Sequence, residues 1–293
     1  MSTQQTAKTQ YVDAPNGVRF AYRRIGTGFG VPLVLVTHFR GTMDKWDPLL
    51  INILASSRPV ITVDYLGVGL SAGEVATSVR QSAADISLFL ELVGQTEVDL
   101  LGFSLGGYVA QMVALNADPK KVKIRKLILA GTGTSYGPKL VASRNEDVGS
   151  VAGTQYVTID TFKTLFFPKT REGEAAAEAW WARIHERSTA TSGEKVSQWL
   201  SNGFQDKAKG RNFTAQLETS QGVEGAYDRL PGLKIPVLVA NGHDDYMIPT
   251  PNSFLIQQLV PNGQLILYPN SGHGFLFQYA DLFAKHVLIF LEA

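Results

Sequence analysis

Six short apolar runs, rich in β-branched residues and spread along the chain, constrain the fold of this sequence more than any other feature. A run that is apolar at every position predicts a strand buried on both faces, and such strands occur mainly in parallel sheets covered by helices. Helical patterns separate most of the runs, so the alternation predicts a doubly wound α/β sheet. The runs are residues 33–37, 60–64, 98–102, 126–130, 237–240 and 264–268.

The first part of the chain has a different pattern. Residues 10–13 and 18–23 flank the turn sequence Pro15-Asn16-Gly17, which predicts an antiparallel hairpin ahead of the parallel strands. Clear helical spacing of apolar residues then occurs in three stretches, residues 78–93, 106–116 and 279–291.

The interval 136–230 breaks the alternation, because it contains no convincing buried strand. Helical patterns occupy residues 175–187 and surround Trp199, and large aromatic side chains are frequent. Their density favours a surface that covers something apolar, although a plain run of surface helices has the same pattern. We predict a helical lid at 136–230, inserted before the last two strands of one core formed by residues 1–135 and 231–293.

The charge balance argues against several classes of partner. The 27 basic and 26 acidic side chains give a formal net charge of +1, so we expect neither a nucleic-acid nor a membrane partner. The absence of cysteine excludes disulfides, thiolate metal sites and cysteine nucleophiles. The polar first residues do not read as a secretory signal, and no apolar run approaches the roughly 20 residues of a membrane span. The default expectation is a cytoplasmic protein that acts on a small molecule, with its oligomeric state open.

Ser104 is the candidate nucleophile. It lies between Gly102 and Gly106, after a strand pattern and before an apolar helical pattern. A nucleophile elbow needs this context, because a serine in a strained turn tolerates only small residues two positions away. The spacing Gly-x-Ser-x-Gly recurs at Ser71 and Ser135, but no apolar helix begins there. The context therefore selects Ser104; the structural alternative is that its glycines only pack the helix on the strand.

These segments, with residues 37–41 and 64–71 and the C-terminal acid and histidine described below, resemble the α/β-hydrolase fold family. Within that family the chain is most similar to the lidded, esterase-type serine hydrolases. The resemblance covers nearly the whole chain and is weakest in the lid. Residues 64–71 depart from the family's frequent Asp-x-Arg-Gly motif, because Leu66 stands where an arginine is common. We expect this departure to remove a structural ion pair and to leave the chemistry intact.

Position selects one base from the five histidines. His273 follows the strand pattern 264–268 in a loop flanked by glycines, which is the place of the family's catalytic histidine. His185 and His286 lie inside helical patterns, where a surface or packing role is more common, and His38 is expected to shape a loop.

The acid that orients the imidazole should follow the strand pattern 237–240, where Asp244 and Asp245 are both candidates. In the family the acid typically lies three residues after a glycine and four before a proline. Gly242 and Pro249 therefore select Asp245, and Asp244 is left as a solvated or supporting carboxylate. The chain order Ser, Asp, His is the order expected for this fold.

The oxyanion of an acyl-transfer intermediate needs two backbone N–H donors. The resemblance implies Leu105 as one donor and the loop after residues 33–37 as the source of the other. Phe39 is our choice there, and Arg40 is the alternative. The glycines of residues 26–30 open no helix, so they predict a turn and no dinucleotide site. No histidine or carboxylate cluster has metal-ligand spacing, and we expect neither a cofactor nor a metal.

The resemblance implies a serine hydrolase that cleaves a carboxylic ester, or a related acyl bond, through an acyl-enzyme and water. A carboxylesterase for small to medium, largely apolar substrates is the leading prediction. Thioester, lactone, amide and carbon–carbon cleavage and perhydrolysis use the same three residues. A ligand-sensing receptor with slow or single-turnover hydrolysis, or a lyase without an acyl-enzyme, also stays open, since this fold hosts many activities.

Overall fold

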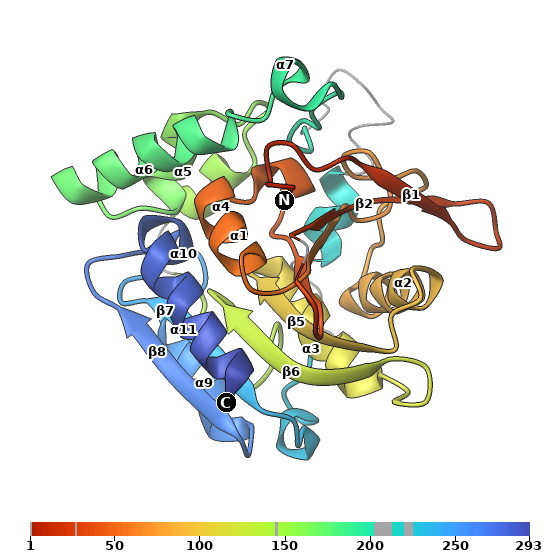
Figure 1. Cartoon of the computed structure of the whole chain (residues 1–293). Helices are drawn as coiled ribbons and strands as arrows, with labels where there is room; N and C mark the ends of the chain where they lie inside the picture. The colour runs from red at the N-terminus through yellow and green to blue at the C-terminus, as the bar shows by residue number, and fades with distance from the viewer. Residues whose placement is uncertain (1, 27, 144–145, 202–212, 220–224) are drawn as a thin grey trace.

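A single eight-stranded sheet forms the centre of the computed structural model, which describes residues 2–26, 28–143, 146–201, 213–219 and 225–293. The strands follow the spatial order β1-β2-β4-β3-β5-β6-β7-β8 (Figure 1). The first two pair antiparallel with each other, β2 pairs antiparallel with β4, and the strands from β3 to β8 run parallel. The predicted fold class is confirmed. The strands are β1 (Gln10–Asp13), β2 (Arg19–Ile25), β3 (Leu33–Val36), β4 (Val60–Val63), β5 (Glu97–Phe103), β6 (Lys123–Ala130), β7 (Val237–Gly242) and β8 (Gly263–Tyr268).

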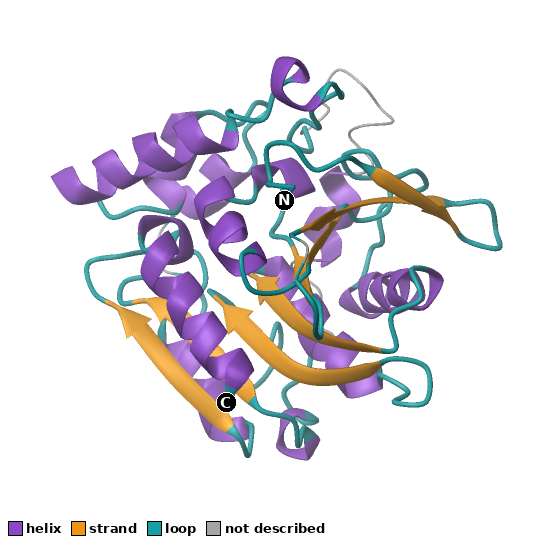
Figure 2. Ribbon diagram, viewed as in Figure 1, coloured by secondary structure: helices purple, strands orange, loops and turns teal. Residues whose placement is uncertain are grey.

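Helices cover both faces of the sheet (Figures 1 and 2). On one face α1 packs on α11, and on the other α2 packs on α3. Two separate apolar clusters, one for each face, result from this arrangement, as expected for strands that carry continuous apolar runs. The covering helices are α1 (Pro48–Ala55), α2 (Val79–Leu92), α3 (Leu105–Asn116), α9 (Pro251–Leu259), α10 (Phe275–Gln278) and α11 (Ala280–Glu292), with the 3₁₀ turns η1 (Met43–Lys45) and η2 (Leu230–Gly232).

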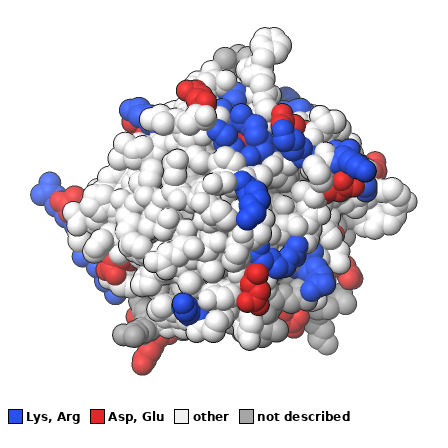
Figure 3. Space-filling view, turned by 90° about the horizontal axis from the view of Figure 1, so that it is seen from below, with Lys and Arg blue, Asp and Glu red and all other residues white. Residues whose placement is uncertain are grey.

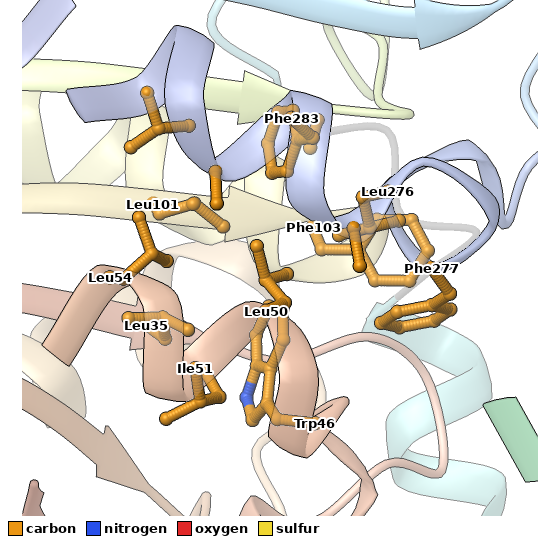
Figure 4. Close-up of a cluster of buried hydrophobic side chains, with 14 of the residues drawn as sticks. Leu35, Trp46, Leu50, Ile51, Leu54, Leu101, Phe103, Leu276, Phe277 and Phe283 are labelled. Carbon is orange, nitrogen blue, oxygen red and sulfur yellow. The ribbon is translucent and has the colours of Figure 1, made fainter. Parts of the chain in front are cut away.

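The core on the α1 and α11 face supports the end of the central strand. Phe103, the last residue of β5, is fully buried, and its ring centroid lies 5.5 Å from that of Phe277 and 6.3 Å from that of Trp46 (Figure 4). Burying an aromatic ring of this size stabilises a fold by about 1.5–3 kcal/mol. This packing holds the end of β5 in place and therefore fixes the position of the next residue, Ser104.

A helical insertion connects β6 to β7 and lies beyond the carboxyl ends of the parallel strands (Figure 1). Residues 144–145, 202–212 and 220–224 of the predicted lid lie outside the described residues. The described helices of the insertion are α4 (Asp147–Ala152), α5 (Ile159–Leu165), α6 (Arg171–Ile184), α7 (Thr189–Ser192) and residues 213–219.

The predicted helix around Trp199 is wrong. Gly193 ends α7 with a positive φ of 68°, and the following residues to 201 have no regular secondary structure. Their backbone groups bond elsewhere, since the Ser197 N–H donates to Asp44 and the Leu200 N–H donates to a carbonyl of the loop after β3. Tertiary hydrogen bonds thus replace the helical ones.

The surface carries charges of both signs. In the view of Figure 3, basic and acidic side chains lie close together along one side, and a broad area carries neither. Within the described part of the chain, no helix is both long enough and apolar enough to pass through a membrane.

Candidate active site

Ser104 occupies a strained turn between β5 and α3. Its φ of 57° and ψ of −122° lie where non-glycine residues are rare. A Cβ on Gly106 would lie 2.0 Å from the Val36 carbonyl oxygen, and one on Gly102 would lie 2.3 Å from the Gly106 carbonyl oxygen. The two glycines are therefore sterically required, because the elbow presses the start of α3 against β3 and β5.

His273 and Asp245 form a buried pair. The Nδ1–H of His273 donates to Asp245 Oδ2 over 2.7 Å, and the other carboxylate oxygen accepts the N–H groups of Met247 and Ile248. A carboxylate held this way only accepts, so it fixes the neutral imidazole with its proton on Nδ1 and a lone pair on Nε2. Asp244 is exposed and accepts the hydroxyl of Tyr246.

The Nε2 atom of His273 is buried and has no hydrogen-bond partner among the described residues. The Ser104 hydroxyl lies at the same edge of the sheet but does not hydrogen-bond to it in this conformation. The ring centroid of Phe103, the residue before Ser104, lies 4.9 Å from that of the His273 ring. The structure therefore brings all three predicted residues to one edge of the sheet and leaves His273 Nε2 without a described partner.

Both predicted oxyanion donors are free of other acceptors among the described residues. Leu105 is the first residue of α3, where backbone N–H groups have no partner within the helix. The Phe39 N–H follows β3 and also has no described partner, whereas the alternative donor, the Arg40 N–H, donates to Gln216 Oε1 over 2.6 Å. This difference favours Phe39 over Arg40.

His38 supports the loop that carries Phe39. Its Nδ1 hydrogen-bonds to the Phe39 carbonyl over 2.9 Å, and its ring packs on Phe103, Phe166 and Trp199. Burial lowers the pKa of His38 to about 3, so the side chain stays neutral near the site.

The other sequence candidates have structural partners. Ser71 donates its hydroxyl to the Asp64 carbonyl and accepts the Ala21 N–H, while His185 is exposed and bonds to its own helix. His286 hydrogen-bonds through its Nδ1 to the hydroxyl of Tyr268, the last residue of β8. Within the described ranges, no group of three or more histidine and carboxylate side chains could hold a metal ion.

Two cavities meet at Ser104 and share the side chains of Phe39, Ala152 and Met247. The narrow cavity measures about 30 Å³ and is bordered by His38, Arg40 and residues of the helical insertion. The wide cavity measures about 670 Å³, within the range of small-molecule sites. Its remaining described lining is Leu105, Tyr108, Ala142, Ser143, Val148, Gly149, Gly153, Phe213, Leu217 and Ile248.

The sequence analysis did not predict two of these lining residues, Tyr108 and Met247, although the sequence position of each indicates that it lies near the site. Tyr108 lies near the start of the predicted helix, four residues after Ser104, so it stays at the end of the helix that is next to the serine. Met247 lies two residues after Asp245 in the same loop. The remaining lid residues of the lining have no sequence signal, because their approach to Ser104 depends on tertiary packing.

Comparison with known proteins agrees with this architecture. The sequence profile described as alpha/beta hydrolase fold matches residues 31–279. The solved alpha/beta hydrolase fold protein from Chitinophaga pinensis is 31% identical, with 99% of both chains covered and a TM-score of 0.82. The 2-hydroxy-6-oxononadienedioate/2-hydroxy-6-oxononatrienedioate hydrolase 1 of Dechloromonas aromatica (strain RCB) is 27% identical, covering 90% of this chain and 88% of the relative. The non-heme chloroperoxidase of Burkholderia pyrrocinia is 26% identical, covering 97% and 99%. The chain belongs to the alpha/beta hydrolase fold family and is an enzyme of that superfamily.

Proposed function

We propose that the protein is a carboxylesterase-like serine hydrolase in which Ser104, His273 and Asp245 form the catalytic triad. The Ser104 hydroxyl rotates toward His273 Nε2, gives it the proton and attacks the ester carbonyl carbon. The oxyanion accepts hydrogen bonds from the Phe39 and Leu105 N–H groups. The carbon–oxygen bond to the alcohol then breaks as Nε2 returns the proton to the leaving oxygen.

The acyl-enzyme is hydrolysed by the same groups in reverse order. His273 Nε2 takes a proton from water, the resulting hydroxide attacks the acyl carbon, and the Ser104 oxygen leaves with that proton. The observation that carries this proposal is the Asp245-bound imidazole. Its buried Nε2 has no partner among the described residues and lies at the edge that holds the strained serine.

The two cavities support an uncharged substrate with unequal halves. About 30 Å³ admits roughly two water-sized groups, so the narrow side suits a compact substituent, and the wide side suits an extended apolar one. The one charged residue in the described linings is Arg40, and its guanidinium already donates to backbone carbonyls.

Carbon–carbon cleavage of a dioate, the reaction named for the Dechloromonas relative, is less well supported. Such a substrate carries two carboxylates, and a buried carboxylate needs a cation or several donors. The described linings offer no uncommitted cation. We infer instead that the substrate is an uncharged ester. We also propose that residues 136–230 act as a lid over the core formed by residues 1–135 and 231–293, and that the protein is cytoplasmic.

Hydrolysis of p-nitrophenyl acetate by three proteins tests the proposal. We expect Ser104→Ala to lose at least about 10³-fold in kcat, as removal of a catalytic nucleophile does. Ser135→Ala is the matched control, since Ser135 has the same flanking glycines and a positive φ of 64°, and it should keep its activity. Full activity in Ser104→Ala would refute the triad, and a single turnover by the wild type would support a ligand-sensing receptor instead.

A second assay tests how long the acyl half and the alcohol half of the substrate can be. Ethyl esters of lengthening acids and acetates of lengthening alcohols are compared by titrating the released acid. We expect one series to lose about 10-fold or more per added group beyond a few carbons and the other to be tolerated, because a filled cavity rejects extra methylenes. Equal profiles would contradict the unequal cavities while leaving the triad intact.

A further inference from the structure

Arg40 lies beside the reaction centre, yet the chemistry proposed above does not use its side chain. We infer that Arg40 is a positioning residue that ties the lid to the Phe39 N–H, so that the oxyanion-binding geometry is complete only when the lid is closed. This inference rests on the proposed function of the site.

The Arg40 guanidinium is buried among backbone carbonyls of the lid. The four hydrogen bonds that it makes to described residues all end on main-chain oxygens of two separate lid segments. It also lies 5.2 Å from the ring centroid of Phe213 in a third segment. The four acceptors are the carbonyl oxygens of Ala152 (3.0 Å), Thr154 (2.8 Å), Gln155 (3.2 Å) and Leu200 (2.7 Å).

No carboxylate pairs with Arg40 among the described residues. Burial lowers its pKa to about 10, so the side chain is still a cation at neutral pH. A buried cation without a counter-ion depends on every carbonyl dipole around it. Moving the lid segments away would leave that charge unsolvated unless water replaced the carbonyls, so the closed lid is the arrangement that satisfies Arg40.

The backbone of Arg40 transmits this constraint to Phe39. The peptide unit between the two residues is bonded at both ends, with the Phe39 carbonyl accepting from His38 Nδ1 and the Arg40 N–H donating to lid residue Gln216. The Arg40 carbonyl also accepts the Leu200 N–H over 3.0 Å. Because Gln216 and Leu200 belong to the lid, the orientation of this peptide unit depends on the lid position. The Phe39 N–H belongs to the preceding peptide unit, which is joined to this one at the Phe39 Cα, so the lid acts on the Phe39 N–H through that atom.

The conformation of Arg40 indicates that the side chain has a role. Its φ of 64° is a left-handed conformation that glycine adopts freely and that costs other residues about 1–2 kcal/mol. A glycine would adopt this backbone conformation without the energetic cost. The guanidinium contacts offset this strain, and they do so only in the presence of the lid.

The test compares Arg40→Gly with Arg183→Ala. The first change suits the backbone and removes the guanidinium, so the variant should fold. Arg183 is the matched control, because it joins lid helix α6 to Asp47 and to the Phe277 carbonyl in the core without touching the oxyanion loop. The assays are kcat and KM for p-nitrophenyl acetate and the inhibition constant of a trifluoromethyl ketone, which forms an oxyanion on the serine.

For Arg40→Gly we expect kcat to fall about 10- to 100-fold and the ketone to bind weaker by a similar factor, with KM changed less than about threefold. Gln216→Leu should give a smaller loss of the same kind, and Arg183→Ala should keep kcat within about threefold. A normal kcat in Arg40→Gly, or an equal loss in Arg183→Ala, would overturn the coupling.

Hydrogen exchange separates this inference from the proposed function. The hydrogen-bonded amides of residues 40 and 41 should exchange at least about 10-fold faster in Arg40→Gly than in the wild type, and their exchange should be unchanged in Arg183→Ala. A wild type without esterase turnover would refute the proposed function, whereas unchanged exchange in Arg40→Gly would refute the coupling whatever the activity.

Discussion

Asp64 should make the protein less stable as the pH rises, and the change Asp64→Asn should remove that effect. The Asp64 carboxylate is fully buried after β4 and accepts the N–H groups of Met43 and Leu70. No arginine pairs with it among the described residues, and Leu66 stands where relatives of this type commonly carry one. Burial therefore raises the pKa of Asp64 to about 7.

The magnitude follows from proton linkage. Between its unfolded pKa of 3.8 and its folded pKa of about 7, Asp64 binds more protons in the folded state than in the unfolded state. The free energy of unfolding therefore falls as the pH rises through this window. Integrated from pH 4.5 to pH 8, the loss is about 3 kcal/mol, which is a large fraction of an ordinary protein's total stability.

His38 masks this effect in the wild type. Its pKa is lowered from 6.5 to about 3 by burial, so it binds fewer protons in the folded state, and its contribution to stability rises with pH between those values. Over the same interval it offsets nearly all of the Asp64 effect. The informative quantity is thus the difference between wild type and Asp64→Asn at each pH.

Urea unfolding, followed by circular dichroism at several values between pH 4.5 and pH 8, measures this difference. Asp64→Asn loses one acceptor and should be less stable by about 1–3 kcal/mol at low pH. As the pH rises, its stability should approach or exceed that of the wild type. A stability difference that stays constant within about 0.5 kcal/mol across the series would refute the raised pKa and the reasoning from burial.

Two further changes test the active site. Asp245→Asn should lower kcat by about 10³–10⁴-fold, because an amide no longer holds the imidazole proton on Nδ1, and the exposed neighbour change Asp244→Asn should have little effect; equal losses would contradict the choice of acid. Gly106→Ala should abolish folding or lower activity at least about 10²-fold, since its Cβ meets the Val36 carbonyl oxygen at 2.0 Å. Thermal unfolding and kcat are compared with those of Gly232→Ala, where a Cβ meets nothing within 4 Å and φ, as at Gly106, is not positive, so an equal loss in both variants would contradict the clash.

Much of the fold could be predicted from local sequence because the determining interactions are local. The strand, turn and helix around Ser104 are encoded by residues within a dozen positions of it, and the choice of Asp245 over Asp244 follows from spacing to Gly242. The conformation around Trp199 could not be predicted in this way. Its segment bonds to residues about 150 positions earlier, such as Asp44, and those contacts outweigh the helical periodicity.

Backbone strain marks the edge of the sheet that holds the site. The glycines that flank Ser104 predict the strain at that residue, whereas no comparable sequence signal predicts it at Arg40. In the described part of the chain, the non-glycine residues with positive φ are Arg40, Ser104, Ser135 and Asn270, which follow β3, β5, β6 and β8. All four therefore lie beyond the carboxyl ends of parallel strands, where ligands bind in sheets of this kind. Of these residue types only asparagine favours a left-handed backbone, so the strain at Ser104 and Arg40 is held by tertiary contacts. At Ser104 that contact is the close packing of α3 on β3, and at Arg40 it is the helical insertion between β6 and β7. Under the coupling proposed above, the serine is strained whether or not the insertion moves, whereas the loop that carries Phe39 is held only while the insertion is in place.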